Sequence, residues 1–302
     1  MKQGIAKFGS EIEKKEFVKA EDAAFEKRLD DAIEQIVHSG ELRVILLSGP
    51  SGSGKTTASE KISKKFADFG KRLVFVAIDD FYLDKDENAR RAAAEGREAE
   101  HESVKSIDLD ALAEFAREIE KGEKGYVPRF SFAEGKRVGR REVDLSGSPV
   151  VLLEGIQAVY PEVEALFMHL ECAELFIRPM GELKCGDRVF DCNELRMFRR
   201  IVRNCLQRGS SAEKELEMWK TVRDNEEKNI FTQIHNRVIC VDSMHAYGVN
   251  MLKPMLGRYL SEVSENSPHK AYAEDIIRRI ADIEPIDREY LSIGSLFCEF
   301  VY

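Results

Sequence analysis

The sequence predicts an α/β fold, with a parallel sheet of about five strands and helices on both of its faces. The first observation is a set of short, mostly apolar runs, the pattern of strands that are buried on both faces. These runs occupy residues 43–47, 73–78, 150–153, 175–177 and 238–241. The second observation is that amphipathic segments lie between several of the runs. Strands that alternate with helices in this way form parallel sheets that are covered on both faces.

Three segments have the apolar spacing of amphipathic helices. Residues 11–38 are the first, and their apolar face includes Phe25 and Ile33. We expect this helix to pack on the outside of the domain. The second helix follows the first apolar run and begins near Lys55, and the third covers residues 108–121.

A glycine-rich turn joins the first apolar run to the helix that follows it. Residues 49–56 have the sequence GPSGSGKT, which fits the P-loop pattern G-x-x-x-x-G-K-S/T. Backbone N–H groups of such a loop point inward around a phosphate, because glycine has no Cβ in the way. The pattern therefore predicts a P-loop NTPase fold. The predicted nucleotide-binding residues are Gly49, Ser51, Gly52, Ser53, Gly54, Lys55, Thr56 and Thr57.

Lys55 and Thr56 indicate that the ligand is ATP with Mg²⁺. A lysine at this position supplies a mobile positive charge to the β- and γ-phosphates, and a threonine hydroxyl ligates the metal. The helix that begins near Lys55 adds unpaired N–H donors and the positive end of its dipole. The alternative is a strand–helix turn without a ligand, which does not explain the Lys-Thr pair.

Three acidic residues follow predicted strands directly. Asp79 and Asp80 come after the second apolar run, and Glu154 comes after the third. Ligands of open parallel sheets gather outside the carboxyl ends of the strands. Phosphoryl transfer needs one carboxylate to accept the proton of the attacking hydroxyl and others to hold magnesium. We predict Asp79 as the base and Glu154 as a magnesium or water ligand, and the alternative is that they cap the following segment.

Five segments resemble the uridine kinase and phosphoribulokinase family of P-loop kinases. They are GPSGSGKTT (49–57), IDDFYLD (78–84), PRFSFAEGKR (128–137), LLEGIQAVYP (152–161) and RMFRRIVRNCLQRG (196–209). Two further segments, 217–231 and 293–302, are similar to motifs of a bacterial, uridine kinase-like branch. The resemblance covers the chain from about residue 43 to its end.

The resemblance implies a five-stranded parallel core, a hairpin on the substrate side and a helical, arginine-bearing lid. Residues 126–138 have the pattern of that hairpin on their own. By resemblance, Asp79 takes the proton from the acceptor hydroxyl, Tyr82 lies beside the substrate and Glu154 sits near magnesium. The lid arginines, which would reach the transferring phosphoryl group or the nucleotide, are Arg196, Arg199, Arg200 and Arg203.

The spacing of these arginines supports such a role. They are three or four residues apart, so most of them share one face of a helix. Guanidinium groups in a row repel one another unless anions neutralise them, and a transferring phosphoryl group would do so. The alternative is a solvent-exposed face paired with Glu194 and nearby acids. We predict Arg196, Arg200 and Arg203 as catalytic residues, together with Lys55 and Asp79.

The acceptor side departs from the family. Where the family usually has an aromatic–aspartate pair, residues 99–102 are AEHE, so Glu100 is the candidate to replace the aspartate that holds sugar hydroxyls. His101 should border the same pocket. Phe130 stands where nucleoside-specific members often have tyrosine. The predicted substrate-binding residues are Asp79, Tyr82, Glu100, His101, Phe130 and Arg137.

The predicted function is the transfer of the γ-phosphoryl group of ATP to a hydroxyl of a small metabolite, with a nucleoside as the favoured acceptor. A sugar phosphate or another small alcohol stays open, because cations in and after the hairpin could hold an acceptor phosphate. A nucleotide-binding regulatory protein with little turnover also stays open, since the acceptor segments are altered.

Composition limits the partners and the location. The net charge of −9 argues against a nucleic-acid binder. No apolar run approaches the ~20 residues that span a bilayer, and the N-terminal residues lack the apolar core of a secretory signal. We expect a cytoplasmic protein without a membrane partner. The sequence does not decide between a monomer and a homo-oligomer. The expected organisation is a helical extension (1–40), a P-loop kinase domain (41–260) and a C-terminal extension (261–302) packed on the same domain.

Overall fold

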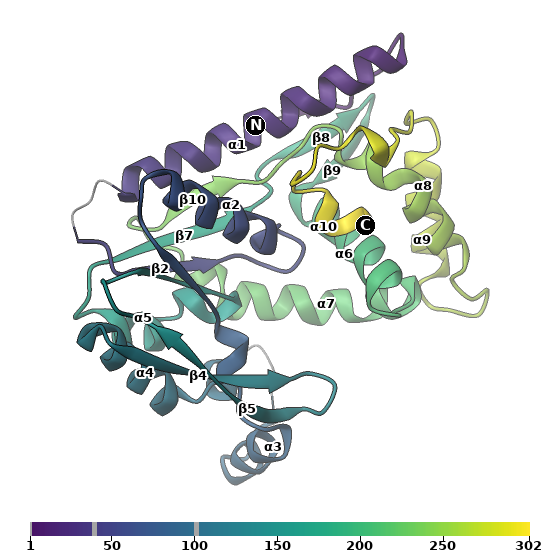
Figure 1. Ribbon diagram of the computed structural model, residues 1–302. Helices are drawn as coiled ribbons and strands as arrows, with labels where there is room; N and C mark the ends of the chain where they lie inside the picture. Colours follow the sequence, from purple (N-terminus) through teal and green to yellow (C-terminus); the bar gives the residue numbers. More distant parts are fainter. Residues whose placement is uncertain (1, 38–40, 100–102) are drawn as a thin grey trace.

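A five-stranded parallel sheet forms the centre of the molecule in the computed structural model, which describes residues 2–37, 41–99 and 103–302 (Figure 1). The strands lie in the order β10-β7-β2-β6-β3, and every neighbouring pair is parallel. Their bounds are β2 Val44–Ser48, β3 Leu73–Ala77, β6 Val150–Glu154, β7 Cys172–Arg178 and β10 Ile239–Asp242. These strands are the five apolar runs of the sequence, so the predicted fold class is confirmed.

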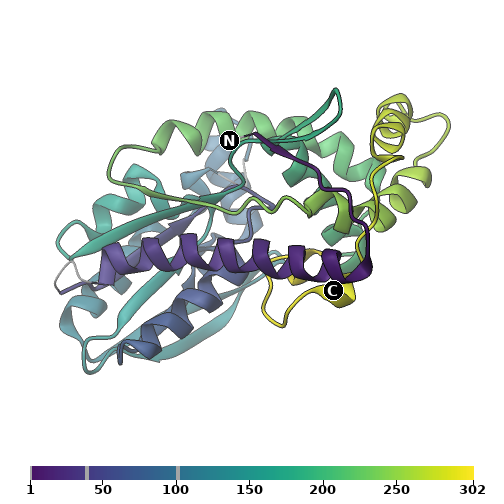
Figure 2. The same cartoon turned by 90° about the horizontal axis from the view of Figure 1, so that it is seen from above.

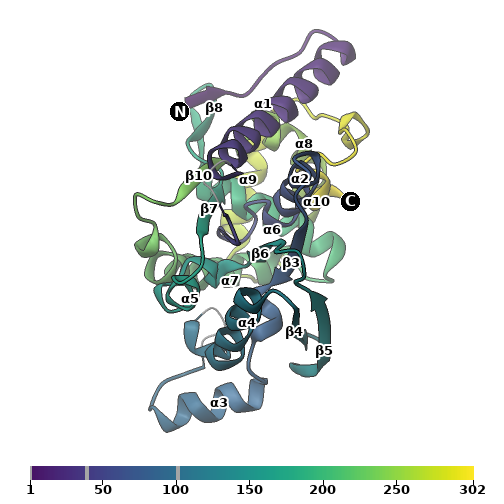
Figure 3. The ribbon, with the colours of Figure 1, turned by 60° about the vertical axis from the view of Figure 1, so that its left-hand side comes forward.

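The sheet is buried on both faces because its residues alternate between two hydrophobic clusters. In β2, Ile45 and Leu47 belong to one cluster, whereas Val44 and Leu46 belong to the other. Helices α1 (Glu11–Val37) and α2 (Lys55–Asp68) pack into the first cluster. Helices α4 (Leu109–Lys121) and α5 (Pro161–Phe167) pack into the second, on the opposite face (Figures 1 and 3).

A two-stranded antiparallel hairpin lies beside the sheet. It consists of β4 (Lys124–Ser131) and β5 (Lys136–Asp144), and β4 packs against the short helix η1 (Ile78–Phe81). The predicted hairpin is therefore confirmed, with longer strands than the sequence indicated. Helix α3 (Lys85–Ala94) lies at the same end of the molecule (Figure 3).

The last third of the chain is mostly helical and closes the other end of the molecule. It contains α6 (Cys192–Gln207), α7 (Ala212–Asn229), α8 (Gly248–Ser261), α9 (Lys270–Ile280) and α10 (Cys298–Val301). Helix α6, the predicted lid, packs on α7, α8 and α10, and most of its apolar residues are buried in the first hydrophobic cluster. It is therefore part of the core of this structure.

A small second sheet, which the sequence analysis did not predict, has the order β1-β8-β9. Its strands are β1 (Lys2–Gly4), β8 (Glu182–Cys185) and β9 (Arg188–Asp191). Within the described ranges, no helix has the length and apolar character needed to cross a membrane.

The N-terminal helix and the C-terminal segment lie side by side. Figure 2 shows the C-terminal segment beside the first turns of α1, and the hydroxyl of Ser295 donates to Asp22 Oδ1 at 3.0 Å. Phe25, Leu47 and Phe300 belong to one hydrophobic cluster, although they come from the three predicted regions of the chain. The boundaries after residues 40 and 260 stay predictions.

Candidate active site

The P-loop connects the end of β2 to the beginning of α2. Gly52 and Gly54 have φ values of 76° and 94°, in the left-handed region that favours glycine. A Cβ on Gly54 would lie 2.5 Å from Leu296 Cδ1, so the close approach of the C-terminal segment also requires glycine there. Lys55 Nζ donates to the carbonyl oxygen of Gly49 at 2.8 Å and closes the loop. These features fix the curvature of the loop.

A cavity of about 740 Å³ lies at the carboxyl ends of the central strands. Six of the eight predicted nucleotide-binding residues line it, at positions 51–56. Asp79, which follows β3, and Glu154, which ends β6, also line it. Gly49 and Thr57 lie at the two ends of the loop, outside the lining. The sheet therefore brings the phosphate loop and two carboxylates to one hollow.

The acidity of the Glu154 carboxyl group is strongly changed within this hollow. Its burial raises its pKa to about 7, and the negative charges of Asp79 and Glu299 act in the same direction. The ammonium group of Lys55 opposes the shift. The register that pairs Ala77 with Glu154 places Asp79 two residues beyond the neighbouring strand end. A divalent cation would relieve the repulsion among these carboxylates.

Asp80 has a different role from Asp79. Its carboxylate accepts a bond from the backbone N–H of Phe130 at 3.4 Å, and it is not part of the cavity lining. Burial raises its pKa, and this backbone bond opposes the rise. Asp80 thus links η1 to the hairpin.

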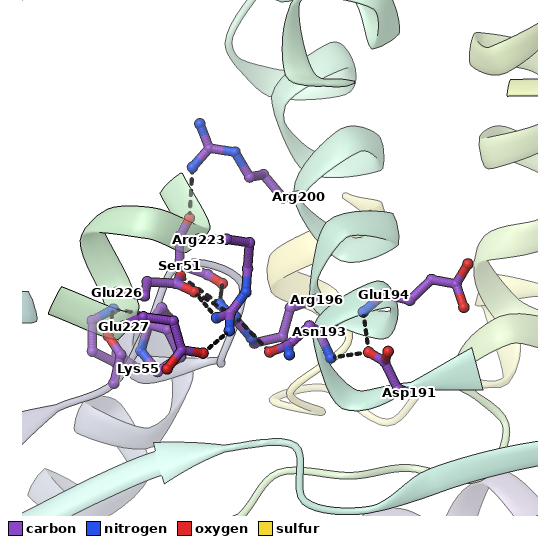
Figure 4. Close-up of polar contacts among 12 residues, drawn as sticks. Ser51, Lys55, Asp191, Asn193, Glu194, Arg196, Arg200, Arg223, Glu226 and Glu227 are labelled. Carbon is purple, nitrogen blue, oxygen red and sulfur yellow. Dashed lines mark hydrogen bonds and ion pairs between the residues drawn. The ribbon is translucent and has the colours of Figure 1, made fainter. Parts of the chain in front are cut away.

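Arg196, a predicted catalytic residue, lies beneath the P-loop and outside the cavity lining (Figure 4). Its guanidinium donates to both carboxylate oxygens of Glu226, at 2.7 and 2.6 Å, and to the carbonyl oxygen of Ser51 at 2.9 Å. Arg196 and Glu226 are each 1% exposed. Because a protein carboxylate already neutralises it, this arginine supports the loop from below.

Arg200 and Arg203 line the cavity, as the sequence analysis expected of phosphate-side residues. Arg200 donates to Ser51 Oγ at 3.0 Å (Figure 4). It also pairs with Glu215 at 2.7 Å. Arg203 Nη1 lies 3.5 Å from Glu299 Oε1. Both cations can therefore face an anion in the hollow.

Arg199, the remaining member of the predicted arginine set, has protein partners. Arg199 is buried; it donates to the carbonyl oxygen of Ser243 at 2.9 Å and lies 4.8 Å from the centre of the Phe297 ring. Glu194, the partner proposed in the alternative interpretation, pairs with Arg279. Buried contacts of this kind depend on packing between helices, which residue spacing does not reveal.

Aromatic side chains contribute to another part of the cavity lining. Tyr82 and Phe132 line it, and Phe130 packs edge-on against both, with ring centres 5.6 and 5.3 Å away. The Tyr82 hydroxyl accepts a bond from Gln157 Nε2 at 2.8 Å, which fixes the ring. Phe132 was not predicted. Phe130 is not among the described residues that line the cavity, although its two aromatic neighbours are.

Arg137, a predicted substrate-binding residue, is outside the lining. Its guanidinium donates to the backbone oxygens of Tyr82 and Phe81 and pairs with Asp108 at 2.8 Å. The arginine therefore holds the segment that carries Tyr82. Glu100 and His101, also predicted substrate-binding residues, lie outside the described residues, and Glu98 and Ala99 just before them line the cavity.

Glu299 is another site residue that sequence reasoning missed. It lines the cavity, and its Oε2 accepts bonds from both the N–H and the hydroxyl of Thr57, at 3.3 Å each. The only signal in the sequence was the similarity of residues 293–302 to a family segment. A site that binds phosphate groups gives no reason to expect an acidic residue at that position.

Comparison with known families shows to which protein family the chain belongs. The model of the phosphoribulokinase / uridine kinase family matches residues 44–249, from β2 to the start of α8. The chain belongs to this family. The match contains the P-loop, Asp79 and Glu154, and it ends before Glu299.

Family members named uridine kinase are similar over different shares of their length. The enzyme of Saccharomyces cerevisiae is 26% identical over 214 residues, which cover 69% of this chain but only 39% of the yeast enzyme. The enzyme of Schizosaccharomyces pombe is 34% identical over 121 residues, 40% of this chain and 26% of that enzyme. The enzyme of Ureaplasma parvum is 25% identical over 207 residues, 65% of this chain and 90% of that enzyme.

A solved structure has the same fold. It is a candidate fructose transport system kinase from Silicibacter sp. TM1040, with a TM-score of 0.51 and 17% sequence identity. The match covers 71% of this chain and 98% of that chain. At this identity the similarity concerns the fold alone.

Proposed function

We propose that this member of the family is an ATP-dependent kinase that phosphorylates a hydroxyl group of a small metabolite. The observation that carries the proposal is the shared cavity, in which P-loop residues 51–56, Asp79 and Glu154 face one another. A nucleotide-binding module without chemistry would need only the loop. The acid at the end of β3 is the additional group that phosphoryl transfer requires.

The residues of the cavity fit ATP with magnesium. Backbone N–H groups at the start of α2 and the ammonium group of Lys55 are donors for phosphate oxygens. The Thr56 hydroxyl and the Glu154 carboxylate are oxygen ligands of the kind that Mg²⁺ prefers, and both line the cavity. Bound magnesium would neutralise charge on the phosphate oxygens.

The side chains then divide the remaining work. Asp79 accepts the proton of the acceptor hydroxyl. The oxygen of that hydroxyl then bonds to the γ-phosphorus, and the bond between the γ-phosphorus and the β,γ-bridging oxygen breaks. Lys55, Arg200 and Arg203 stabilise the negative charge that spreads over the phosphoryl oxygens. The products are a phosphate ester and ADP.

A nucleoside is the acceptor that the cavity supports best. Tyr82 and Phe132 provide aromatic faces on the acceptor side, and base–aromatic stacking tolerates any base. The curated relatives named uridine kinase agree with this choice. The proposal does not assign a particular base, because Phe130 has no hydroxyl to recognise one.

The test is ATP consumption with nucleosides, sugar phosphates and polyols as acceptors. We expect turnover with at least one nucleoside, and Asp79→Asn should lower kcat by about 10²-fold or more while Mg·ATP still binds. Lys55→Ala, the control for binding, should lose the nucleotide-dependent rise in Tm. Near-normal turnover of the Asp79 variant would show that Asp79 is not the general base. Binding of Mg·ATP without consumption on the whole panel would favour the regulatory alternative.

A further inference from the structure

The C-terminal segment of the chain reaches into the phosphate side of the cavity. Leu296 packs on Gly54 of the P-loop, and Glu299 lies one helical turn further on. The carboxylate of Glu299 accepts bonds from the N–H and the hydroxyl of Thr57, at 3.3 Å each. Its other oxygen lies 3.5 Å from Arg203 Nη1. The Glu299 side chain is only 13% exposed.

These contacts are the ones that a phosphate oxygen would make. Thr57 is the third residue of α2, and the first N–H groups of a helix have no partner within it. In a P-loop, these N–H groups cradle the α- and β-phosphates. A carboxylate at this place accepts from the same N–H donors and lies at the positive end of the same helix dipole. Arg203 supplies a cation close to its negative charge. Glu299 therefore resembles a bound anion supplied by the chain itself.

Hydrogen bonds to backbone carbonyl oxygens hold this segment independently of the Glu299 side chain. Gln207 Nε2 donates to the carbonyl oxygens of Glu299 and Tyr302, at 2.9 and 3.3 Å. Arg288 Nη1 donates to the carbonyl oxygen of Val301 at 2.9 Å. Gln207 lies outside the cavity lining. The strength of attachment can thus be changed without altering any charge in the cavity.

We propose that residues 295–302 are an internal competitor of the donor nucleotide, with Glu299 occupying the phosphate end of α2 until a nucleotide displaces it. This inference rests on the proposed nucleotide site and adds a regulatory contact to it. Two anions cannot share the Thr57 donors, so nucleotide binding must move the Glu299 carboxylate away. Displacement of the segment would also move Leu296 off Gly54.

Two substitutions test the competition through the Kd of Mg·ATP, measured by calorimetry on the full chain. Glu299→Gln keeps the shape but removes the charge, and we expect about tenfold tighter binding. Gln207→Ala leaves every charge in place but loosens the segment, and we expect about threefold tighter binding. Glu289→Gln, an exposed site that removes the same charge outside the cavity, is the control and should leave the Kd unchanged.

The pattern of results separates displacement from simple repulsion. Tighter binding in Glu299→Gln with no change in Gln207→Ala would mean that the charge repels nucleotide while the segment stays in place, and the proposal would be wrong. Weaker binding in either variant would show that the segment supports the nucleotide, which also overturns it. If the unaltered chain and both variants all fail to bind Mg·ATP, the proposed nucleotide site itself is wrong, and the competition proposed here is wrong with it.

Hydrogen exchange gives a second, independent measurement. The amides of Phe300 and Tyr302 donate to the carbonyl oxygens of Phe297 and Cys298 in this structure. With saturating Mg·ATP, we expect them to exchange faster while residues 49–57 become protected. Unchanged or slower exchange at residues 300–302, together with a protected P-loop, would contradict the displacement.

Discussion

At the scale of single residues, the acidity of Glu154 has a direct consequence for stability. Burial raises its pKa from 4.5 to about 7 in the folded chain without ligands. In the unfolded chain the group is solvated and keeps its ordinary value. The folded state therefore binds a proton more tightly than the unfolded state between these two pKa values, and ionisation of Glu154 at higher pH opposes folding.

We predict that the ligand-free protein loses stability as pH rises from about 4.5 to 7 through this group, with no further loss above 7. The Glu154 contribution amounts to roughly 3 kcal/mol. Glu154→Gln removes the charge, so its advantage over the unaltered protein should grow over this range and then stay constant. Urea unfolding at pH 5, 6, 7 and 8 measures the difference. An advantage that does not change with pH would contradict the predicted ionisation.

Sequence alone predicted the residues whose function depends on their neighbours along the chain. The P-loop belongs to this class, because its glycines, Lys55 and Thr56 act together within eight positions. Sequence also favoured Asp79 over Asp80 as the base, but it could not show the role of Asp80, because the backbone N–H that Asp80 accepts from lies in the hairpin, fifty residues further along the chain. Glu299 reaches Thr57 across 242 residues, and a contact of that separation leaves no local pattern.

At the scale of elements, α6 connects the P-loop to the helical end of the molecule. The sequence correctly predicted a helix with its arginines three and four residues apart. The burial of those arginines follows from α7, α8 and α10 packing around α6, and no spacing rule contains that information. The pair between Arg196 and Glu226 is the most buried ion pair of this junction. Ion pairs of this kind are costly to break because a charge is left in the interior.

We predict that Arg196→Met lowers the free energy of unfolding by about 3 kcal/mol. The Glu226 carboxylate would remain buried, with Arg223 as its nearby cation, and the Ser51 carbonyl oxygen would lose its donor. Lys220→Met on the same helix as Glu226 is the matched control, because Lys220 pairs with Asp224 on the surface. The control should change stability by about 0.5 kcal/mol or less. Equal decreases in the free energy of unfolding in both variants would show that the buried pair stabilises the fold no more than the surface pair does.

At the scale of the whole molecule, the N-terminal helix is joined to the site through the C-terminal segment. Tyr247 donates from its hydroxyl to Asp22 Oδ1 at 2.6 Å, and Ser295 donates to the same oxygen. Helix α1 also contributes Val18, Phe25 and Ile33 to the cluster that contains α2 and α6. The sequence predicted α1 as an outer helix but gave no indication of these partners, which lie more than two hundred residues away along the chain.

We predict that α1 unfolds together with the rest of the chain. Phe25 is buried and its ring lies 5.3 Å from the ring of His245, so Phe25→Ala should lower the free energy of unfolding by about 3–5 kcal/mol. Ile12→Ala in the same helix, at a side chain that is 73% exposed, is the control and should change it by about 0.5 kcal/mol or less. Trp219, the single tryptophan, lies on α7, far from Phe25 in the sequence. In urea, its fluorescence and the far-ultraviolet circular dichroism should therefore follow one transition in both variants. A loss of helix signal in Phe25→Ala before the fluorescence changes would show that α1 is a separate unit attached to an independently stable core.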